Sequence, residues 1–166
     1  MKNIVLIGMP GSGKSTVGVV LAKAMGMQFI DTDLLIQQKT GETLQTTINT
    51  KGLEAFLKVE EDVLSSIEVN SFVIATGGSA VLSQNAMEHL KKNSILVFLN
   101  VTLSELKNRI SNITTRGIAM KKGEDIATVY ETRLPLYKKY SNITVSPDTL
   151  TLEQTVEEIF MQLKDY

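Results

Sequence analysis

The residues with the clearest chemistry form a glycine-rich loop near the start of the chain. It reads Gly8-Met9-Pro10-Gly11-Ser12-Gly13-Lys14-Ser15 and fits the pattern G-x-x-x-x-G-K-[ST]. The loop follows an apolar run and precedes a helical pattern, which is the setting in which such loops bind phosphate. Glycines let successive backbone N–H groups turn toward phosphate oxygens, and the helix N-terminus adds its dipole. The alternative is an ordinary glycine-rich turn between a strand and a helix.

This loop predicts a site for a nucleoside triphosphate and Mg²⁺. We expect Lys14 to reach the β- and γ-phosphates and the Ser15 hydroxyl to bind the metal. The nucleotide-binding residues predicted from the loop are Gly11, Ser12, Gly13, Lys14, Ser15 and Thr16. Hydrolases and kinases share this loop, so it leaves the phosphate acceptor open.

Two carboxylates, Asp31 and Asp33, follow the second predicted strand. Ligands of open α/β sheets bind at the carboxyl ends of the strands, and alternation along an extended chain would place both side chains on one side. Asp31 would then assist Mg²⁺, and Asp33 would accept a hydrogen bond from a substrate hydroxyl or take its proton. Either aspartate could also cap the helix that follows, a role compatible with catalysis.

A further strand end carries the segment Thr76-Gly77-Gly78-Ser79. Paired glycines at a strand end allow a ligand to approach backbone N–H groups closely. Gly77, Gly78 and Ser79 are therefore candidates for substrate binding. A plain turn is the alternative for this segment.

The three arginines of the chain lie close together in the sequence, between residues 109 and 133. Arginine binds phosphate and carboxylate groups with two parallel hydrogen bonds, so this grouping suggests anionic ligands. Arg116 lies in a polar stretch at about 111–123 that we expect to form a lid over the γ-phosphate. We expect Arg133 to bind an anionic group of the substrate, and Arg109 to face the nucleotide base or solvent.

Composition excludes several other classes of site. The chain has 166 residues and a formal net charge of -1, so no overall basic field suggests a nucleic acid or an anionic membrane as partner. It has no cysteine and one histidine, which excludes disulfides, thiolate zinc sites and histidine clusters. No apolar run approaches the ~18 residues of a membrane span, and the N-terminus does not resemble a secretory signal. We therefore expect a soluble, cytoplasmic protein.

The order of the elements predicts how the candidate residues are positioned. Short apolar runs alternate with helical patterns, which indicates an α/β fold with a mainly parallel sheet, in a single domain over residues 1–166. The expected strands are 3–7, 28–30, 71–75, 95–100 and 143–145. The expected helices are 14–25, 33–38, 53–67, 85–92, 103–110, 125–139 and a last one that begins at the capping box Thr151-x-x-Gln154. Within helix 53–67, Glu60, Glu61 and Asp62 are expected largely off the apolar face.

Together these motifs resemble the shikimate kinase family. The segments that carry the resemblance are the glycine-rich loop, Asp31-Thr32-Asp33, Gly52 with Phe56 and Glu60, Ala75-Thr76-Gly77-Gly78, and Arg133-Leu134-Pro135-Leu136-Tyr137. The resemblance implies a three-layer P-loop kinase fold, with a five-stranded parallel sheet in the order 2-3-1-4-5 flanked by helices. It also implies a substrate-binding segment at about 33–60, a lid at about 111–123, and ATP-dependent phosphorylation of shikimate to shikimate 3-phosphate. We expect a monomer.

For the nucleotide, the resemblance assigns Lys14 and Ser15 to the phosphates and the metal. It places Asp31 near the same Mg²⁺, makes Arg116 the lid arginine, and sets Arg109 beside the adenine. For the acceptor, the roles fall to a second group of residues. The implied substrate-binding residues are Asp33 at the accepting hydroxyl, Gly77, Gly78 and Ser79 along the substrate, and Arg133 at its carboxylate. The implied catalytic residues are Lys14, Asp33 and Arg116.

Three positions depart from the family's pattern. Where the family has Phe-Arg, this chain has Phe56-Leu57, and the missing arginine is one of two that normally bind the shikimate carboxylate. Lys58 is adjacent, but on a helix it points ~100° away. Ser79 stands where the family has its third glycine, and Gly117 stands where the family has a proline after the lid arginine. Two alternatives therefore stay open: a kinase of another small polyhydroxy or carboxylate metabolite, such as a gluconate-kinase-like acceptor, and an ATP-binding module without catalysis.

Overall fold

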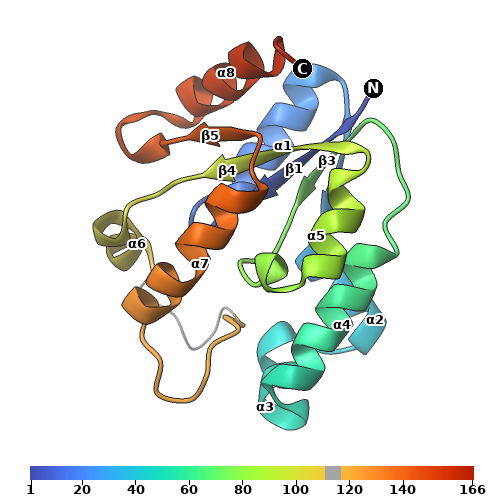
Figure 1. The fold of residues 1–166 in the computed structure, drawn as a ribbon, viewed down its shortest axis with the longest axis vertical. Coiled ribbons are helices and arrows are strands. Elements are labelled where there is room, and N and C mark those ends of the chain that lie inside the picture. The colour runs from blue at the N-terminus through green and yellow to red at the C-terminus, as the bar shows by residue number, and fades with distance from the viewer. Residues whose placement is uncertain (111–116) are drawn as a thin grey trace.

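A computed structural model describes residues 1–110 and 117–166, and its centre is a five-stranded sheet (Figure 1). The strands lie in the order β2-β3-β1-β4-β5, and each neighbouring pair is parallel. The strands are β1 (Asn3–Ile7), β2 (Gln28–Asp31), β3 (Phe72–Ala75), β4 (Ser94–Leu99) and β5 (Ile143–Val145). The predicted α/β class and strand order are therefore confirmed.

Eight α-helices and two short 3₁₀ helices occur in the described ranges. The α-helices are α1 (Lys14–Met25), α2 (Thr32–Thr40), α3 (Leu44–Lys51), α4 (Leu53–Ser65), α5 (Gln84–Lys91), α6 (Leu103–Arg109), α7 (Ile126–Tyr140) and α8 (Leu152–Leu163). The 3₁₀ helices are η1 (Ala80–Leu82) and η2 (Pro147–Thr149). The capping box predicted for the last helix is present, because the side chains of Thr151 and Gln154 each accept from the other's backbone N–H. None of the helices described is both long and apolar enough to cross a bilayer.

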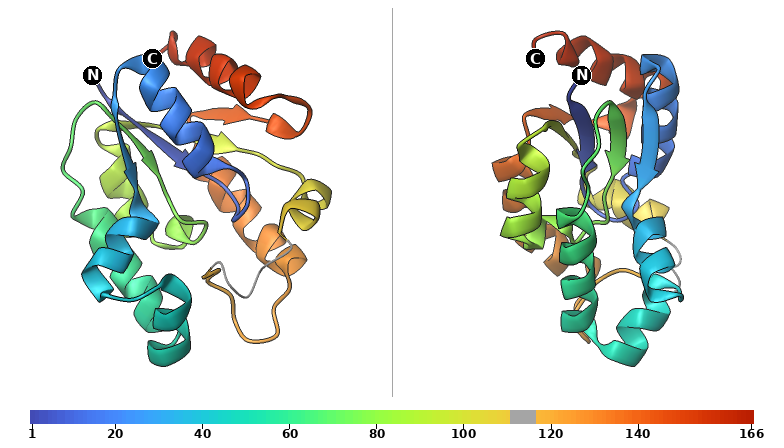
Figure 2. Two further views of the ribbon diagram at one scale, coloured as in Figure 1. Left: turned by 180° about the vertical axis from the view of Figure 1, so that it is seen from behind. Right: turned by 90° about the vertical axis from the view of Figure 1, so that its right-hand side faces the viewer.

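The sheet is covered by helices on both faces, which gives three layers (Figure 2). Along β1, Ile4 and Leu6 pack into one core cluster with residues of α1 and α8. Val5 and Ile7 pack into another cluster with residues of α5 and α7. Strands buried on both faces have near-continuous apolar sequences, which explains the apolar runs from which the strands were predicted.

Helix α3 is not predicted by the sequence pattern. Its residues are mostly Thr, Gln, Asn and Lys, which give no apolar stripe and a modest intrinsic helix propensity. Thr43 caps it by accepting a hydrogen bond from the Thr46 N–H, and Leu44 is buried in a cluster with Phe56 of α4 and Ile36 of α2. Tertiary packing therefore stabilises this helix, and the cluster forms a lobe at the carboxyl ends of the strands (Figure 1).

Candidate active site

The glycine-rich loop connects β1 to α1, as predicted. A Cβ atom on Gly8 would lie 2.8 Å from the Leu99 carbonyl oxygen, so only glycine fits there without a shift. Gly13 has a φ of 90°, in the left-handed region that favours glycine, and it precedes the first residue of α1. The Lys14 Nζ donates hydrogen bonds of 2.8 Å to the carbonyls of Gly8 and Met9, and so holds the loop curled.

The Lys14 ammonium is buried at the base of the site. Burial lowers its pKa to about 8, although the nearby Asp33 and Asp31 carboxylates raise it. A phosphate group beside this nitrogen would favour the charged form and would gain from a weakly screened charge. The lysine therefore suits the predicted role at the terminal phosphates.

Ser15 and Asp31 meet at the end of β2. The Ser15 hydroxyl donates to Asp31 Oδ2 at 2.6 Å, and Asp31 Oδ1 accepts from the Asp33 N–H at 3.0 Å. Asp31 is therefore the cap of α2, which leaves the Asp33 carboxylate available for other contacts. The expected strand alternation between the two aspartates is wrong, because α2 begins at Thr32.

The Ser15 and Asp31 oxygens fit a magnesium ion. Both are hard oxygen donors of the kind that Mg²⁺ prefers. Within residues 1–110 and 117–166, no group of three or more His, Cys, Asp or Glu side chains could hold a metal. An ion at this pair would take its other ligands from phosphate and water, as Mg²⁺ commonly does in kinase sites.

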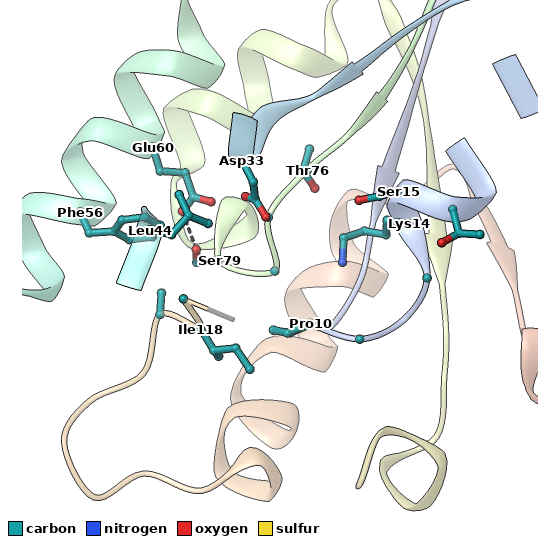
Figure 3. Close-up of a pocket in the computed structure, with 17 residues that line it drawn as sticks. Pro10, Lys14, Ser15, Asp33, Leu44, Phe56, Glu60, Thr76, Ser79 and Ile118 are labelled. Atoms are coloured by element: carbon teal, nitrogen blue, oxygen red, sulfur yellow. Dashed lines mark hydrogen bonds between the residues drawn. The ribbon is translucent and has the colours of Figure 1, made fainter. Parts of the chain in front are cut away.

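A cavity of about 340 Å³ lies between the phosphate loop and the lobe of α2, α3 and α4 (Figure 3). Lys14 stands on one side of it and the carboxyl groups of Asp33 and Glu60 on another. Its lining includes nine of the predicted site residues: Gly11, Gly13, Lys14, Ser15, Thr16, Asp33, Gly77, Gly78 and Ser79. The remaining lining residues are Pro10, Leu44, Phe56, Glu60, Thr76, Gly117, Ile118 and Ala119. The fold thus joins the phosphate loop and the predicted acceptor segments in one space.

Asp33 has the properties of a proton acceptor near neutral pH. Burial and the neighbouring Asp31 carboxylate raise its pKa to about 6, against the opposing effect of Lys14. A base with a pKa close to the working pH combines an ionised population with a useful affinity for the proton.

Glu60 is a site residue that the helical pattern alone placed wrongly. The pattern predicts that it lies largely off the apolar face of its helix, yet it is 1% exposed and lines the cavity. Burial raises its pKa to about 7, while a hydrogen bond from Ser79 lowers it. Its spacing from Phe56, one turn earlier on the buried side of α4, is the signal that could have located it.

The two glycines after β3 bring the walls of the cavity close together. A Cβ on Gly77 would lie 2.7 Å from Glu60 Oε1 and 3.0 Å from Asp33 Oδ1. A Cβ on Gly78 would lie 2.5 Å from Pro10 Cδ of the phosphate loop. Tyr137, fully buried on α7, donates its hydroxyl to the Gly78 carbonyl at 2.6 Å. This segment therefore links the phosphate loop, the two carboxyl groups and α7.

The predicted arginines lie outside the cavity lining or outside the described residues. Arg133 is buried on α7 and donates to the carbonyl of Ala119, which does line the cavity; its Nη1 has no partner among the described residues. Arg109, at the end of α6, donates from Nε to Glu105 Oε1 at 2.7 Å. Arg116 lies within residues 111–116, outside the described ranges.

The departures from the family's pattern take distinct positions. Leu57 does not line the main cavity, and Lys58 lies on the exposed side of α4, where it pairs with Glu61 at 3.0 Å and Asp62 at 3.2 Å. Lys58 therefore does not replace the missing arginine. The Ser79 hydroxyl is donated to Glu60 rather than left open to a ligand. Gly117 has a φ of 65°, and a Cβ there would lie 2.5 Å from Leu44 Cβ.

Comparison with known proteins identifies the family. The shikimate kinase family model matches residues 10–164. A shikimate kinase of Sulfurihydrogenibium sp. (strain YO3AOP1) is 36% identical over 99% of both chains. One of Rippkaea orientalis (strain PCC 8801 / RF-1) is 37% identical over 95% of this chain and 85% of the relative.

Solved structures agree with the sequence matches. A shikimate kinase from Acinetobacter baumannii in complex with shikimate superposes with a TM-score of 0.90 and 28% identity, covering 99% of this chain and 94% of the other. A gluconokinase from Sinorhizobium meliloti 1021, at a TM-score of 0.55 and 22% identity over 99% of this chain and 92% of the other, shares the fold alone. The chain belongs to the shikimate kinase family.

Proposed function

We propose that the protein transfers the γ-phosphate of ATP to a ring hydroxyl of shikimate, forming shikimate 3-phosphate and ADP. The observation that carries the proposal is that one cavity is lined by Lys14 of a phosphate-binding loop and by Asp33, a carboxyl group with a pKa of about 6. Family membership supplies the identity of the acceptor.

The residues divide the work of transfer between phosphate and acceptor. Asp33 orients the accepting hydroxyl and takes its proton as the hydroxyl oxygen bonds to the γ-phosphorus and the bond to the ADP oxygen breaks. Lys14 and the backbone N–H groups of the loop stabilise the charge on the transferred group. Ser15 and Asp31 would hold Mg²⁺, which neutralises phosphate charge when bound.

We assign the acceptor's carboxylate to Arg133. Its guanidinium donates to Ala119 at the cavity wall and would exchange that carbonyl for the carboxylate. Gly77 and Gly78 would present their backbone to the ring. With Leu57 in place of a second arginine, the loss of one charge-assisted contact predicts affinity about 30- to 150-fold weaker than with both arginines.

The remaining assignments concern the nucleotide and the whole chain. We propose that Arg116 acts from a lid at about 111–123, that Arg109 flanks the adenine, and that residues 33–60 form the substrate-binding segment. We also propose a single-domain, cytoplasmic monomer that binds no nucleic acid or membrane.

A steady-state assay of ADP formation tests the function. With ATP and Mg²⁺, millimolar shikimate should stimulate ADP release well above the rate without acceptor, and gluconate at the same concentration should not. If the rate of ADP formation with shikimate equals the rate without an acceptor, the proposal is refuted. Nucleotide binding without any acceptor-dependent turnover would instead identify a non-catalytic ATP-binding module.

A further inference from the structure

The hydrogen bond between Ser79 and Glu60 forms part of the acceptor side of the cavity. We propose that Ser79 is a positioning residue, whose hydroxyl fixes the Glu60 carboxyl group so that its second oxygen faces the acceptor beside Asp33. The inference rests on the proposed shikimate kinase activity and deepens it, because it names what orients the acceptor side in this chain.

The two side chains come from different segments of the chain and meet where both are buried. Ser79 follows β3, Glu60 lies on α4, and the Ser79 Oγ donates to Glu60 Oε2 at 2.6 Å (Figure 3). The residues are 5% and 1% exposed. Hydrogen bonds to buried carboxylates are among the stronger ones, so this contact restricts how the carboxyl group can turn.

The other carboxyl oxygen of Glu60 suggests that a ligand binds beside it. Glu60 Oε1 has no hydrogen-bond partner among the described residues, although it is buried. Together with Asp33 Oδ1 it flanks the position of a Cβ on Gly77, at 2.7 and 3.0 Å. A buried carboxyl oxygen without a partner is costly, and a bound polyhydroxy acceptor offers the hydroxyl that it lacks.

Without the Ser79 hydroxyl, the Glu60 side chain could rotate into a neighbouring cavity. A second cavity of about 300 Å³, lined by Leu57 and Leu82 among others, shares Glu60 and Ser79 with the main cavity. The hydrogen-bonded pair thus stands between the two spaces. The charged groups that act on Glu60 come from three other elements: Asp33 on α2, Arg133 on α7 and Lys14 on α1. Leu57, one turn earlier on α4, offers no donor.

A matched pair of serine variants tests the proposal. Ser83 donates to Glu61 Oε2, which is the same kind of serine–glutamate contact at the next residue of α4. Neither Ser83 nor Glu61 lines the main cavity. Ser79→Ala should raise the KM for shikimate about ten-fold or more, the usual effect of losing a hydrogen bond to a charged group, and leave the KM for ATP unchanged. Ser83→Ala should lower Tm but change neither KM. Ser79→Thr, which keeps the hydroxyl, should restore the KM for shikimate.

The outcomes separate this inference from the proposed function. If Ser79→Ala and Ser83→Ala both lower Tm and both keep the wild-type KM for shikimate, Ser79 is only structural and the inference is wrong. If the wild-type protein shows no shikimate-dependent ADP formation, the proposed function fails and the inference fails with it. Should Ser79→Ala not fold, Ser79→Cys keeps most of the volume with a weaker donor, and should raise the same KM.

A double-mutant cycle with Leu57 gives a second, independent readout. An arginine at this position would lie one turn from Glu60 and could supply the missing donor. Ser79→Gly should therefore raise the KM for shikimate about ten-fold in the wild-type background and much less in the Leu57→Arg background. An equal rise in both backgrounds would contradict the positioning role.

Discussion

At the scale of single residues, Asp33 and Glu60 are two buried carboxyl groups with raised pKa values and different partners. Asp33 has a pKa of about 6, and the nearby Lys14 ammonium acts to lower that pKa. Glu60 has a pKa of about 7 and holds a hydrogen bond from Ser79. At neutral pH Asp33 is therefore the more ionised of the two and the better candidate for the base.

Replacing Asp33 by Asn should abolish transfer and preserve ATP binding. The amide cannot accept the hydroxyl proton, so kcat should fall by about 10²- to 10⁴-fold, while calorimetric binding of ATP with Mg²⁺ stays close to wild type. In the wild-type protein, kcat/KM should decrease below about pH 6 because Asp33 becomes protonated. Asp62→Asn, on the exposed side of α4, is the control. Undiminished transfer by Asp33→Asn would remove Asp33 from its role.

Glu60 should make the folded protein less stable as the pH rises. Its pKa is about 7 in the folded chain against an ordinary 4.5, so the folded state holds more protons than the unfolded state between these values. The free energy of unfolding should therefore fall by about 3 kcal/mol across this interval in the wild type relative to Glu60→Gln. Chemical denaturation at several pH values measures the difference, with Glu61→Gln as the matched control. Parallel curves for wild type and Glu60→Gln would contradict it.

At the scale of elements, α7 supports the glycine segment after β3. Tyr137 stacks on Phe98 with ring centroids 5.1 Å apart and donates to the Gly78 carbonyl. Tyr137→Phe leaves that carbonyl without its donor, so the free energy of unfolding should fall by about 1–3 kcal/mol. Thermal unfolding measures this, with Tyr140→Phe on the same helix as control. An unchanged Tm would show that the bond contributes nothing net.

At the same scale, Leu44 of α3 and Gly117 lie against each other in the lining of the cavity. Gly117→Ala would add a left-handed backbone strain of about 1–2 kcal/mol and a clash with Leu44. We expect a lower Tm and a higher KM for shikimate, because Gly117, Ile118 and Ala119 line the cavity.

Gly123→Ala is the control for this contact. Gly123 has a similar φ of 87°, but a Cβ there would meet nothing within 4 Å. It should therefore lower Tm without changing the KM for shikimate. Equal kinetic effects of the two variants would show that backbone strain, and not the contact with α3, is responsible.

For the molecule as a whole, nucleotide should stabilise the fold most when Mg²⁺ is present. The Ser15–Asp31 pair supplies few ligands, so we expect Mg²⁺ to bind chiefly with phosphate. ATP with Mg²⁺ at ~100 times its Kd should add about 3 kcal/mol, which is roughly 5–10 °C in Tm for a chain of this size. Chelating the metal should abolish transfer and reduce this rise, but leave the Tm of the protein alone unchanged. A Tm that falls on chelation without nucleotide would indicate a structural metal.

Local patterns along the chain predict the strands and the phosphate loop. The five strands follow from apolar runs, and the phosphate loop from the fixed spacing of Gly8, Gly13, Lys14 and Ser15. These depend on neighbours along the chain, because an apolar run, the φ of a glycine and a helix cap each involve only a few consecutive residues. The gathering of loop and strand-end residues in one cavity followed from the parallel topology, which brings the carboxyl ends of the strands to one edge.

Which groups meet inside that cavity depends on packing between segments that are far apart along the chain. The burial of Glu60 against Ser79, the formation of α3 and the bond from Arg133 to Ala119 join segments that are distant along the chain. Residue type does not predict whether Asp31 or Asp33 caps the helix, because both are aspartates and aspartate is a favoured cap; in the structure the cap is Asp31. A sequence pattern shows which faces of an element are apolar. Whether a charged side chain can be buried depends on the hydrogen-bond and charge partners that tertiary packing places beside it.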